Sequence, residues 1–227
     1  MSAPLQIAID GPVAAGKGDI AMRLAKRLGF TYLYTGAMYR ALALACIEKG
    51  IGTQDEKSVK DLLTTLSIEL LPGIADRFYT VHLDAKDVTD RIFEPDVASL
   101  VPQVSQHAEV RKIMVDKQQN MAQGKSVVME GRDIGKRVLP HAQLKIFLTA
   151  SLEERARRRL EQFKERGIHK TFEEVQLETR TRDQQDSTRA ADPLEKLPDA
   201  WELDTTNLTQ DEVVEKITEE LKRRNLV

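Results

Sequence analysis

The sequence has 227 residues, of which 41% are apolar and 31% are charged, and its formal net charge is −2. This composition is typical of a globular domain, and the near-neutral charge excludes a global field that would draw the chain onto nucleic acid or an anionic membrane. No apolar run is long enough to span a bilayer, no charged leader precedes an apolar stretch, and the single cysteine, Cys46, excludes an internal disulfide. We therefore expect a cytoplasmic monomer without nucleic-acid or membrane partners.

The first fifty residues alternate short strands with helices. Residues 5–10 and 31–34 are predicted strands, and residues 17–28 and 36–49 are predicted helices, each followed by a glycine. Cys46 lies in the apolar part of the second helix, which favours a buried core residue over a nucleophile. The strand–helix rhythm predicts an α/β fold.

The middle of the chain has a different pattern. Three short strand candidates predict a small antiparallel insertion, at residues 67–71, 78–83 and 86–89. Residues 94–123 are predicted to be helical, with breaks near Pro102 and His107.

Strands and helices alternate again in the last hundred residues. Predicted strands occupy residues 126–130, 144–149 and 201–204. Ser151, Thr171 and Thr209 each precede a glutamate by three residues, the pattern of a capping box at a helix start, and the closing helix is predicted over residues 209–224.

These patterns predict a single domain over residues 1–227. We assign its core to about residues 1–35, 125–150 and 195–227, an insertion to about residues 36–124, and a lid with arginine-rich helices to about residues 151–194. There is no internal repeat or low-complexity linker.

The strongest motif is a glycine-rich loop between the first strand and the first helix. Glycines let several backbone N–H groups point at one anion, the following helix dipole points at the same place, and a lysine reaches the β- and γ-phosphates. A glycine-rich turn without a ligand is the alternative. The predicted ATP-binding residues are Gly11, Pro12, Val13, Ala14, Ala15, Gly16, Lys17, Gly18 and Asp19.

Together with other motifs, this loop makes the chain similar to the bacterial cytidylate kinases over nearly its whole length. The most specific matches are Thr-Gly-Ala-Met-Tyr-Arg at residues 35–40 and Glu-Gly-Arg-Asp-Ile-Gly at residues 130–135. Further matches lie at residues 9–12, 16–18, 110–111, 145–151, 182–189 and 193–194. The resemblance implies a P-loop NTPase-type parallel sheet flanked by helices, with a short helical lid. It also implies ATP-dependent phosphorylation of CMP and dCMP, with Mg²⁺.

Three acceptor-site candidates lie near one predicted helix start: Thr35, Tyr39 and Arg40. A hydroxyl, a phenol and a guanidinium there suit a sugar phosphate. A half-buried core tyrosine and a solvated arginine are the alternatives. The resemblance implies that all three residues contact the ribose and phosphate of CMP.

Arg132 and Asp133 follow a predicted parallel strand, where ligands of open α/β sheets bind. The two opposite charges could equally well pair with each other. The resemblance assigns Arg132 to the acceptor phosphate, Asp133 to the cytosine edge, and Arg111 to the base. A carboxylate accepts from the exocyclic amino group of cytosine, whereas uracil presents a carbonyl there, which favours CMP over UMP.

Arg182, Asp186 and Arg189 share one helical face. A surface ion-pair ladder is the alternative to the acceptor-binding role that the resemblance implies. Arginines 155, 158 and 159 resemble lid residues over ATP.

Phosphoryl transfer requires positioning and charge neutralisation more than covalent chemistry. We therefore predict that Lys17, Arg155 and Arg159 stabilise the transferring group, and that Arg132 and Arg182 hold the acceptor phosphate. Arg40 would hold the same phosphate. We name no metal-ligating residue, and the four histidines have no zinc-type spacing.

Two residues depart from the family pattern. Asp19 stands where a threonine is usual, and Pro102 stands where a serine usually contacts cytosine. At Pro102 the alternatives are a looser base selectivity and a hydroxyl supplied by Ser99 or Ser105. The alternatives left open are another nucleoside monophosphate kinase, acting on UMP/CMP or AMP, and a non-catalytic nucleotide-binding regulator.

Overall fold

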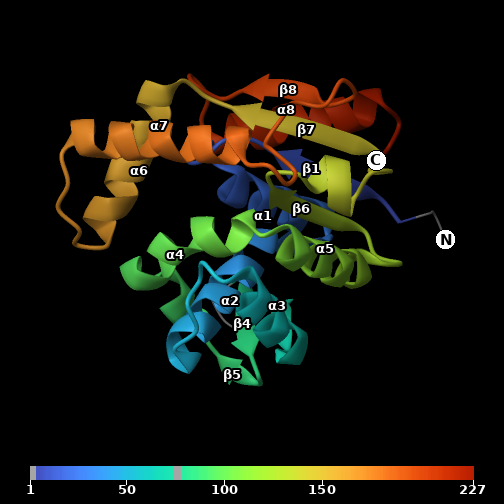
Figure 1. Cartoon of the computed structure of the whole chain (residues 1–227). Coiled ribbons are helices and arrows are strands. Elements are labelled where there is room, and N and C mark those ends of the chain that lie inside the picture. Colours follow the sequence, from blue (N-terminus) through green and yellow to red (C-terminus); the bar gives the residue numbers. More distant parts are fainter. Residues whose placement is uncertain (1–3, 74–77) are drawn as a thin grey trace.

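The computed structural model describes residues 4–73 and 78–227. Within them, five parallel strands form a sheet in the order β2-β6-β1-β7-β8 (Figure 1). The strands are β1 (Gln6–Asp10), β2 (Thr31–Tyr34), β6 (Val127–Gly131), β7 (Leu144–Thr149) and β8 (Trp201–Asp204). The predicted α/β fold with a parallel sheet is confirmed.

Helices cover both faces of this sheet, which explains why the central strand β1 is apolar on both sides. On one face, α1 (Lys17–Leu28) and α8 (Gln210–Arg223) bury residues such as Ile20 and Ile217 against the strands. On the other, α5 (Ala108–Ala122) and a short π-helix (Ile134–Val138) share a second apolar cluster with β6. The carboxyl ends of β1, β6 and β7 therefore lie together at one edge.

The insertion has its own core around α2 (Thr35–Lys49), a helix that is buried almost all round. An antiparallel sheet of β3 (Ile68–Pro72), β4 (Tyr79–Leu83) and β5 (Lys86–Asp87) packs beside it, as predicted. A 3₁₀ turn (Arg91–Phe93) and α4 (Pro95–Gln106) lead into α5. Figure 1 shows these elements below the parallel sheet. Cys46 is buried in this core, as predicted.

Two features of the insertion differ from the sequence prediction. The predicted break at Pro102 is wrong, because α4 continues through it, while the break at His107 is confirmed. Val97 and Val104 are fully buried on either side of the proline, so packing holds the helix across the missing N–H. Helix α3 (Glu56–Thr65) was overlooked, although Asp55 caps it by accepting a hydrogen bond from the backbone N–H of Lys57.

The segment predicted to form a lid is a helical hairpin of α6 (Leu152–Glu165) and α7 (Phe172–Thr188), which extends to one side of the sheet in Figure 1. The capping boxes at Thr171 and Thr209 are confirmed. The third predicted capping box, at Ser151, is only half formed. The Ser151 side chain caps α6, but the carboxylate of Glu154 pairs with Arg158 at 2.9 Å. Among the helices that the structure describes, none combines the length and the apolar composition needed to cross a bilayer.

Candidate active site

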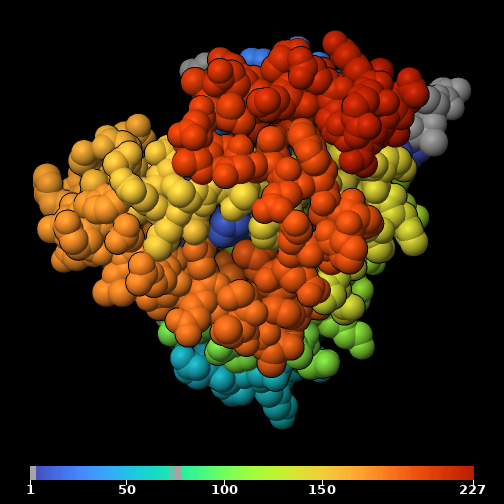
Figure 2. Space-filling view, turned by 90° about the horizontal axis from the view of Figure 1, so that it is seen from above, coloured from blue at the N-terminus to red at the C-terminus, as the bar shows by residue number. Residues whose placement is uncertain are grey.

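The phosphate loop joins the end of β1 to the start of α1, as the sequence predicts. A Cβ atom at Gly11, where φ is 153°, would lie 2.0 Å from the carbonyl oxygen of Leu148, so only glycine fits beneath β7. Gly16 has φ of 89° where the chain turns into the helix. The first turn of α1 thus directs its N–H groups into the loop. In Figure 2, a hollow near the centre of the view shows blue atoms of the N-terminal part of the chain, rimmed by yellow and orange atoms.

Lys17 folds back over this loop, where its Nζ donates a hydrogen bond to the carbonyl oxygen of Pro12 at 2.7 Å. Burial lowers the pKa of the ammonium from 10.5 to about 7, and the positive charge of Arg132 adds to the shift. The carboxylate of Glu130 opposes it. Burial disfavours the charged form of Lys17, and an anion that binds beside it would stabilise that form. A phosphate-binding lysine needs this property.

The loop is tied to the segment after β6 through Asp10, the last residue of β1. Its two carboxylate oxygens accept hydrogen bonds from the backbone N–H groups of Ile134 and Gly135, each at 2.8 Å. Burial raises the pKa of this carboxyl to about 6, although the two hydrogen bonds oppose the shift. Sequence reasoning did not single out Asp10, although it lies within one of the matching motifs. It fixes the segment that carries Arg132 and Asp133.

The structure brings Arg132 and Arg182 together on the carboxylate of Asp186, which is almost fully buried. The nitrogen–oxygen distances are 2.7 Å from Arg132 Nε and 3.2 Å from Arg182 Nε. Although burial opposes it, the two guanidinium groups hold the pKa of Asp186 below its ordinary value. The predicted helical face of α7 therefore turns inward to meet the end of β6 and does not form a surface ladder.

A second charged group surrounds Arg111, whose side chain is 3% exposed. It pairs with Asp133, contacts Asp192 through Nε at 3.1 Å, and donates to the carbonyl oxygen of Ser105 at 3.2 Å. Arg189, the residue just after the end of α7, approaches Asp133 at 3.5 Å. Asp133 thus pairs with residues distant in sequence and not with its neighbour Arg132, so the simple pairing of neighbours does not occur.

Tyr39 and Ser105 lie beside this second group. The guanidinium of Arg111 is 5.8 Å from the centre of the Tyr39 ring, and burial raises the pKa of the phenol to about 12. Of the two serines expected to replace the hydroxyl missing at Pro102, Ser105 is buried next to Arg111, whereas Ser99 is exposed. The hydroxyl of Ser105 donates to the carbonyl oxygen of Pro102 at 3.2 Å.

Thr35 and Arg40 lie at the start of α2, but they face different partners. The hydroxyl of Thr35 donates to the carbonyl oxygen of Glu130 at 2.8 Å, which fastens α2 to the end of β6. Arg40 donates to the Tyr34 hydroxyl at 3.2 Å, and its guanidinium lies 5.0 Å from the centre of the Phe93 ring. Both residues thus reach the same sheet edge from the insertion.

Arg166, which follows α6, was not predicted as a site residue. Its guanidinium lies 5.4 Å from the centre of the Phe93 ring, and its Nη1 is 3.5 Å from the Phe93 carbonyl oxygen. The aromatic ring therefore contacts cations from both the lid and the insertion, since Arg40 also approaches it. No motif indicated this contact.

The lid arginines differ in the partners available to them. Arg155 donates to the protein through Nε and Nη1, and Arg158 pairs with Glu154 and donates to the carbonyl oxygen of Thr205. The buried Nε of Arg159 has no hydrogen-bond partner among the described residues. Burial lowers the pKa of Arg159, and the charges of Arg40, Arg166 and Arg132 lower it further. These guanidinium groups converge on a region suited to an anion.

Asp19 turns toward the start of α8, where the side-chain amide of Gln210 lies 3.4 Å from its Oδ2. Burial raises the pKa of the Asp19 carboxyl, although Arg23 opposes the shift. Within residues 4–73 and 78–227, no group of three or more histidine, cysteine, aspartate or glutamate side chains is arranged to hold a metal ion.

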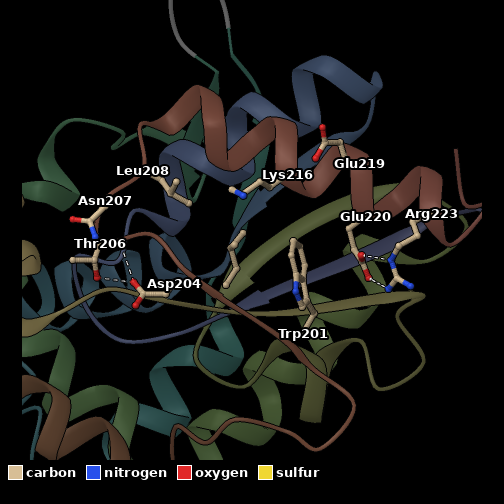
Figure 3. Close-up of a pocket in the computed structure, with 10 residues that line it drawn as sticks. Trp201, Asp204, Thr206, Asn207, Leu208, Lys216, Glu219, Glu220 and Arg223 are labelled. Atoms are coloured by element: carbon tan, nitrogen blue, oxygen red, sulfur yellow. Dashed lines mark hydrogen bonds and ion pairs between the residues drawn. The ribbon is translucent and has the colours of Figure 1, made fainter.

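A separate hollow of about 600 Å³ lies between β8 and α8 (Figure 3). Its lining includes none of the predicted site residues. Within it, Glu220 pairs with Arg223 and Asp204 accepts from Thr206, so these charges are satisfied locally. The predicted site residues gather instead around the carboxyl edge of the parallel sheet.

Comparisons with known proteins show the family to which the chain belongs. The profile of a family described as cytidylate kinase matches residues 7–223. The chain belongs to the cytidylate kinase family. Its relatives include the cytidylate kinase of Caldanaerobacter subterraneus subsp. tengcongensis, 48% identical over 96% of this chain and 95% of the other. The cytidylate kinase of Geobacillus kaustophilus is 47% identical over 99% of each chain.

Solved structures support the fold alone. A shikimate kinase from Acinetobacter baumannii has a TM-score of 0.51 at 15% identity, covering 99% of this chain and 96% of its own. A gluconokinase from Sinorhizobium meliloti has a TM-score of 0.52 at 12% identity, covering 98% and 94%. The predicted family, the fold and a cytidylate kinase activity, which is a phosphotransferase activity, are confirmed. The roles of individual site residues remain predictions.

Proposed function

We propose that the chain transfers the γ-phosphoryl group of ATP to CMP and to dCMP, in the cytoplasm and with Mg²⁺. The observation that supports this most directly is the pairing of Arg132 and Arg182 on buried Asp186. Lys17 lies close enough that, besides burial, the charge of Arg132 lowers its pKa and the charge of Asp186 raises it. The P-loop lysine and the arginine pair therefore lie close enough for their charges to influence one another. Membership of the cytidylate kinase family supports CMP as the acceptor.

In this mechanism the nucleophile is a phosphate oxygen of CMP, which is already anionic and needs no general base. Lys17 and the backbone N–H groups of residues 14–18 bind the β- and γ-phosphates. Arg132 and Arg182 hold the acceptor phosphate in line, and Arg159 offers its unpaired Nε to the transferring group. Closure of α6 and α7 excludes water and prevents ATP hydrolysis.

The donor set fits a Mg²⁺ ion held by phosphate oxygens and water. Gly18 lacks the hydroxyl that usually follows the P-loop lysine. Asp19 and Glu130 place two carboxylates near the start of α1. They are close enough that, in addition to the effect of burial, the charge of Asp19 raises the pKa of Glu130. The bound ion would neutralise charge on the β- and γ-phosphates. The acceptor is held by the protein's own arginines.

A panel of nucleoside monophosphates tests the proposed function. With ATP and Mg²⁺, we expect CMP and dCMP to be phosphorylated with a kcat/KM at least about tenfold above UMP and AMP, because one buried hydrogen bond discriminates by about that factor. Equal use of AMP would contradict a cytidylate preference. Failure to form CDP would favour the regulator alternative.

Base selection is expected to depend on Asp133. In Asp133→Asn the side-chain amide donates to the uracil carbonyl, so the ratio of kcat/KM for CMP to that for UMP is expected to fall about tenfold. Asp192→Asn is the matched control, since Asp192 also contacts Arg111. That variant is expected to weaken CMP use without changing the ratio. Equal ratios in wild type and Asp133→Asn would contradict the assignment.

Asp19→Thr is expected to lower the KM for ATP by about threefold, because it removes a partly exposed negative charge near the triphosphate. The KM for CMP should stay unchanged. Asp211→Asn provides the control, since Asp211 lies in the same surface region and pairs with Arg23 at 2.9 Å. An equal or higher KM for ATP in Asp19→Thr would refute the expectation.

A further inference from the structure

The lid helices hold both backbone polar atoms of Val13, a residue of the phosphate loop. The N–H of Val13 points to Asp183 Oδ1 at 3.4 Å, and its carbonyl oxygen accepts from Arg155 Nη1 at 3.2 Å. The same Nη1 pairs with Asp183 Oδ2 at 2.6 Å. Arg155 lies on α6 and Asp183 on α7, so the ring of contacts joins the loop to both helices of the lid hairpin (Figure 1).

Two of the three guanidinium nitrogens of Arg155 donate to the protein. Its side chain is 8% exposed, and its Nε donates to the carbonyl oxygen of Ala150, just past the end of β7, at 3.0 Å. Arg159, one turn further along α6, has a buried Nε for which the described part of the chain provides no hydrogen-bond partner. Of the two lid arginines predicted to stabilise the transferring phosphoryl group, Arg159 therefore has a donor to offer, whereas the Nε and Nη1 of Arg155 are engaged by the protein.

We propose that Arg155 and Asp183 form a positioning pair, which fixes the phosphate loop at Val13 relative to the lid and to the acceptor-binding face of α7. The inference rests on the proposed function. Asp183 directly follows Arg182 and precedes Asp186 on α7, so the pair connects the loop that binds the donor to the helix that holds the acceptor. Arg155 then acts on the reaction through the loop and not through direct contact with ATP.

This arrangement has a specific kinetic consequence. The loop binds phosphate through backbone N–H groups whose directions must be fixed, and a displacement of about 1 Å in reacting geometry costs about a hundredfold in rate. Loss of the pair should therefore raise the KM for ATP and lower kcat. Binding of CMP alone should change little, because Arg132, Asp133 and Arg111 retain their contacts.

Two single variants test the pair. Asp183→Asn leaves one acceptor oxygen for two donors, and Arg155→Lys keeps a buried cation beside Asp183 but loses the planar group that reaches three acceptors. In each we expect the KM for ATP to rise about tenfold and kcat to fall about tenfold, with the Kd for CMP alone, from calorimetry, within about twofold of wild type. Arg157→Lys is the matched control, since Arg157 forms an exposed pair with Glu153 on the same helix.

The double variant Arg155→Lys/Asp183→Asn completes a mutant cycle. If Arg155 and Asp183 act as one unit, the kcat/KM for ATP of the double variant should be about equal to that of the less active single variant. Multiplicative losses would show independent roles and overturn the proposal. Equal increases in KM for ATP and Kd for CMP, or a lower Tm without a selective effect on ATP, would also overturn it, because both describe a purely structural pair.

The outcome for the proposed function is separate. A wild-type chain that forms no CDP would refute the proposed function, whereas an active wild type with unchanged ATP kinetics in both single variants would refute only the positioning pair.

Discussion

Lys17→Met is expected to lower kcat for CMP phosphorylation by a factor of about a thousand, because it removes the buried cation that faces the transferring charge. Binding of CMP without ATP should be nearly unchanged. Steady-state kinetics and calorimetry measure the two effects. Lys26→Met, an exposed lysine on the same helix, is the matched control and should keep wild-type kinetics. A kcat within about threefold of wild type in Lys17→Met would exclude Lys17 from the chemistry.

The same substitution should leave the fold at least as stable at pH 7. The ammonium of Lys17 is buried at 5% exposure, and its lowered pKa shows that the charged form is disfavoured in the folded state without ligand. A methionine fills a similar volume without a charge. A loss of activity combined with retained stability would show that the cation is kept for function.

The stability of the wild type should also depend on pH in a defined direction. Lys17 has a pKa of about 7 in the folded state against an ordinary pKa of 10.5, so between these pH values the unfolded chain binds more protons. The contribution of Lys17 to the free energy of unfolding therefore rises with pH across that window. Urea unfolding should show that, between pH 7 and pH 9, the free energy of unfolding of the wild type increases relative to that of Lys17→Met. A difference independent of pH would contradict the burial argument.

The sequence predicted the elements that depend on local pattern. Glycines at positions 11 and 16, an apolar strand before them and a helix after them fix the phosphate loop without tertiary information. The predicted bounds of α1, β2, β7 and β8 agree with the structure for the same reason, since each is a short periodic run with a clear stop. Helix α3 also carried a local signal, the Asp55 cap, which was overlooked.

The ion pairs between distant residues could not be predicted from the sequence, because they depend on which distant elements contact one another. Asp186 pairs with Arg132 across 54 residues, and Arg111 pairs with Asp133 across 22. Helical spacing does predict the pair of Arg182 with Asp186, but no local spacing predicts the pairs that Arg132 and Asp133 form with distant residues buried at the sheet edge. The continuation of α4 through Pro102 has the same cause, since packing of Val97 and Val104 outweighs a local preference.

Arg132→Met is expected to raise the KM for CMP by about a hundredfold, because the acceptor phosphate loses a charged donor in a water-poor site. The KM for ATP should change by less than about threefold. The variant should also lose about 2 kcal/mol in the free energy of unfolding, since buried Asp186 loses the closer of the two arginines that form ion pairs with it among the described residues. Lys136→Met is the matched control, because Lys136 lies in the same segment and forms an exposed pair with Glu195.

The double variant Arg132→Met/Asp186→Asn separates phosphate binding from charge compensation. Removing the carboxylate along with its partner relieves the unpaired buried charge, so much of the lost stability should return. The KM for CMP should stay high, because no cation has been restored to the acceptor phosphate. If the double variant recovered CMP affinity together with stability, Arg132 would act only by neutralising Asp186, and Arg182 would remain as the candidate for holding the acceptor phosphate in line.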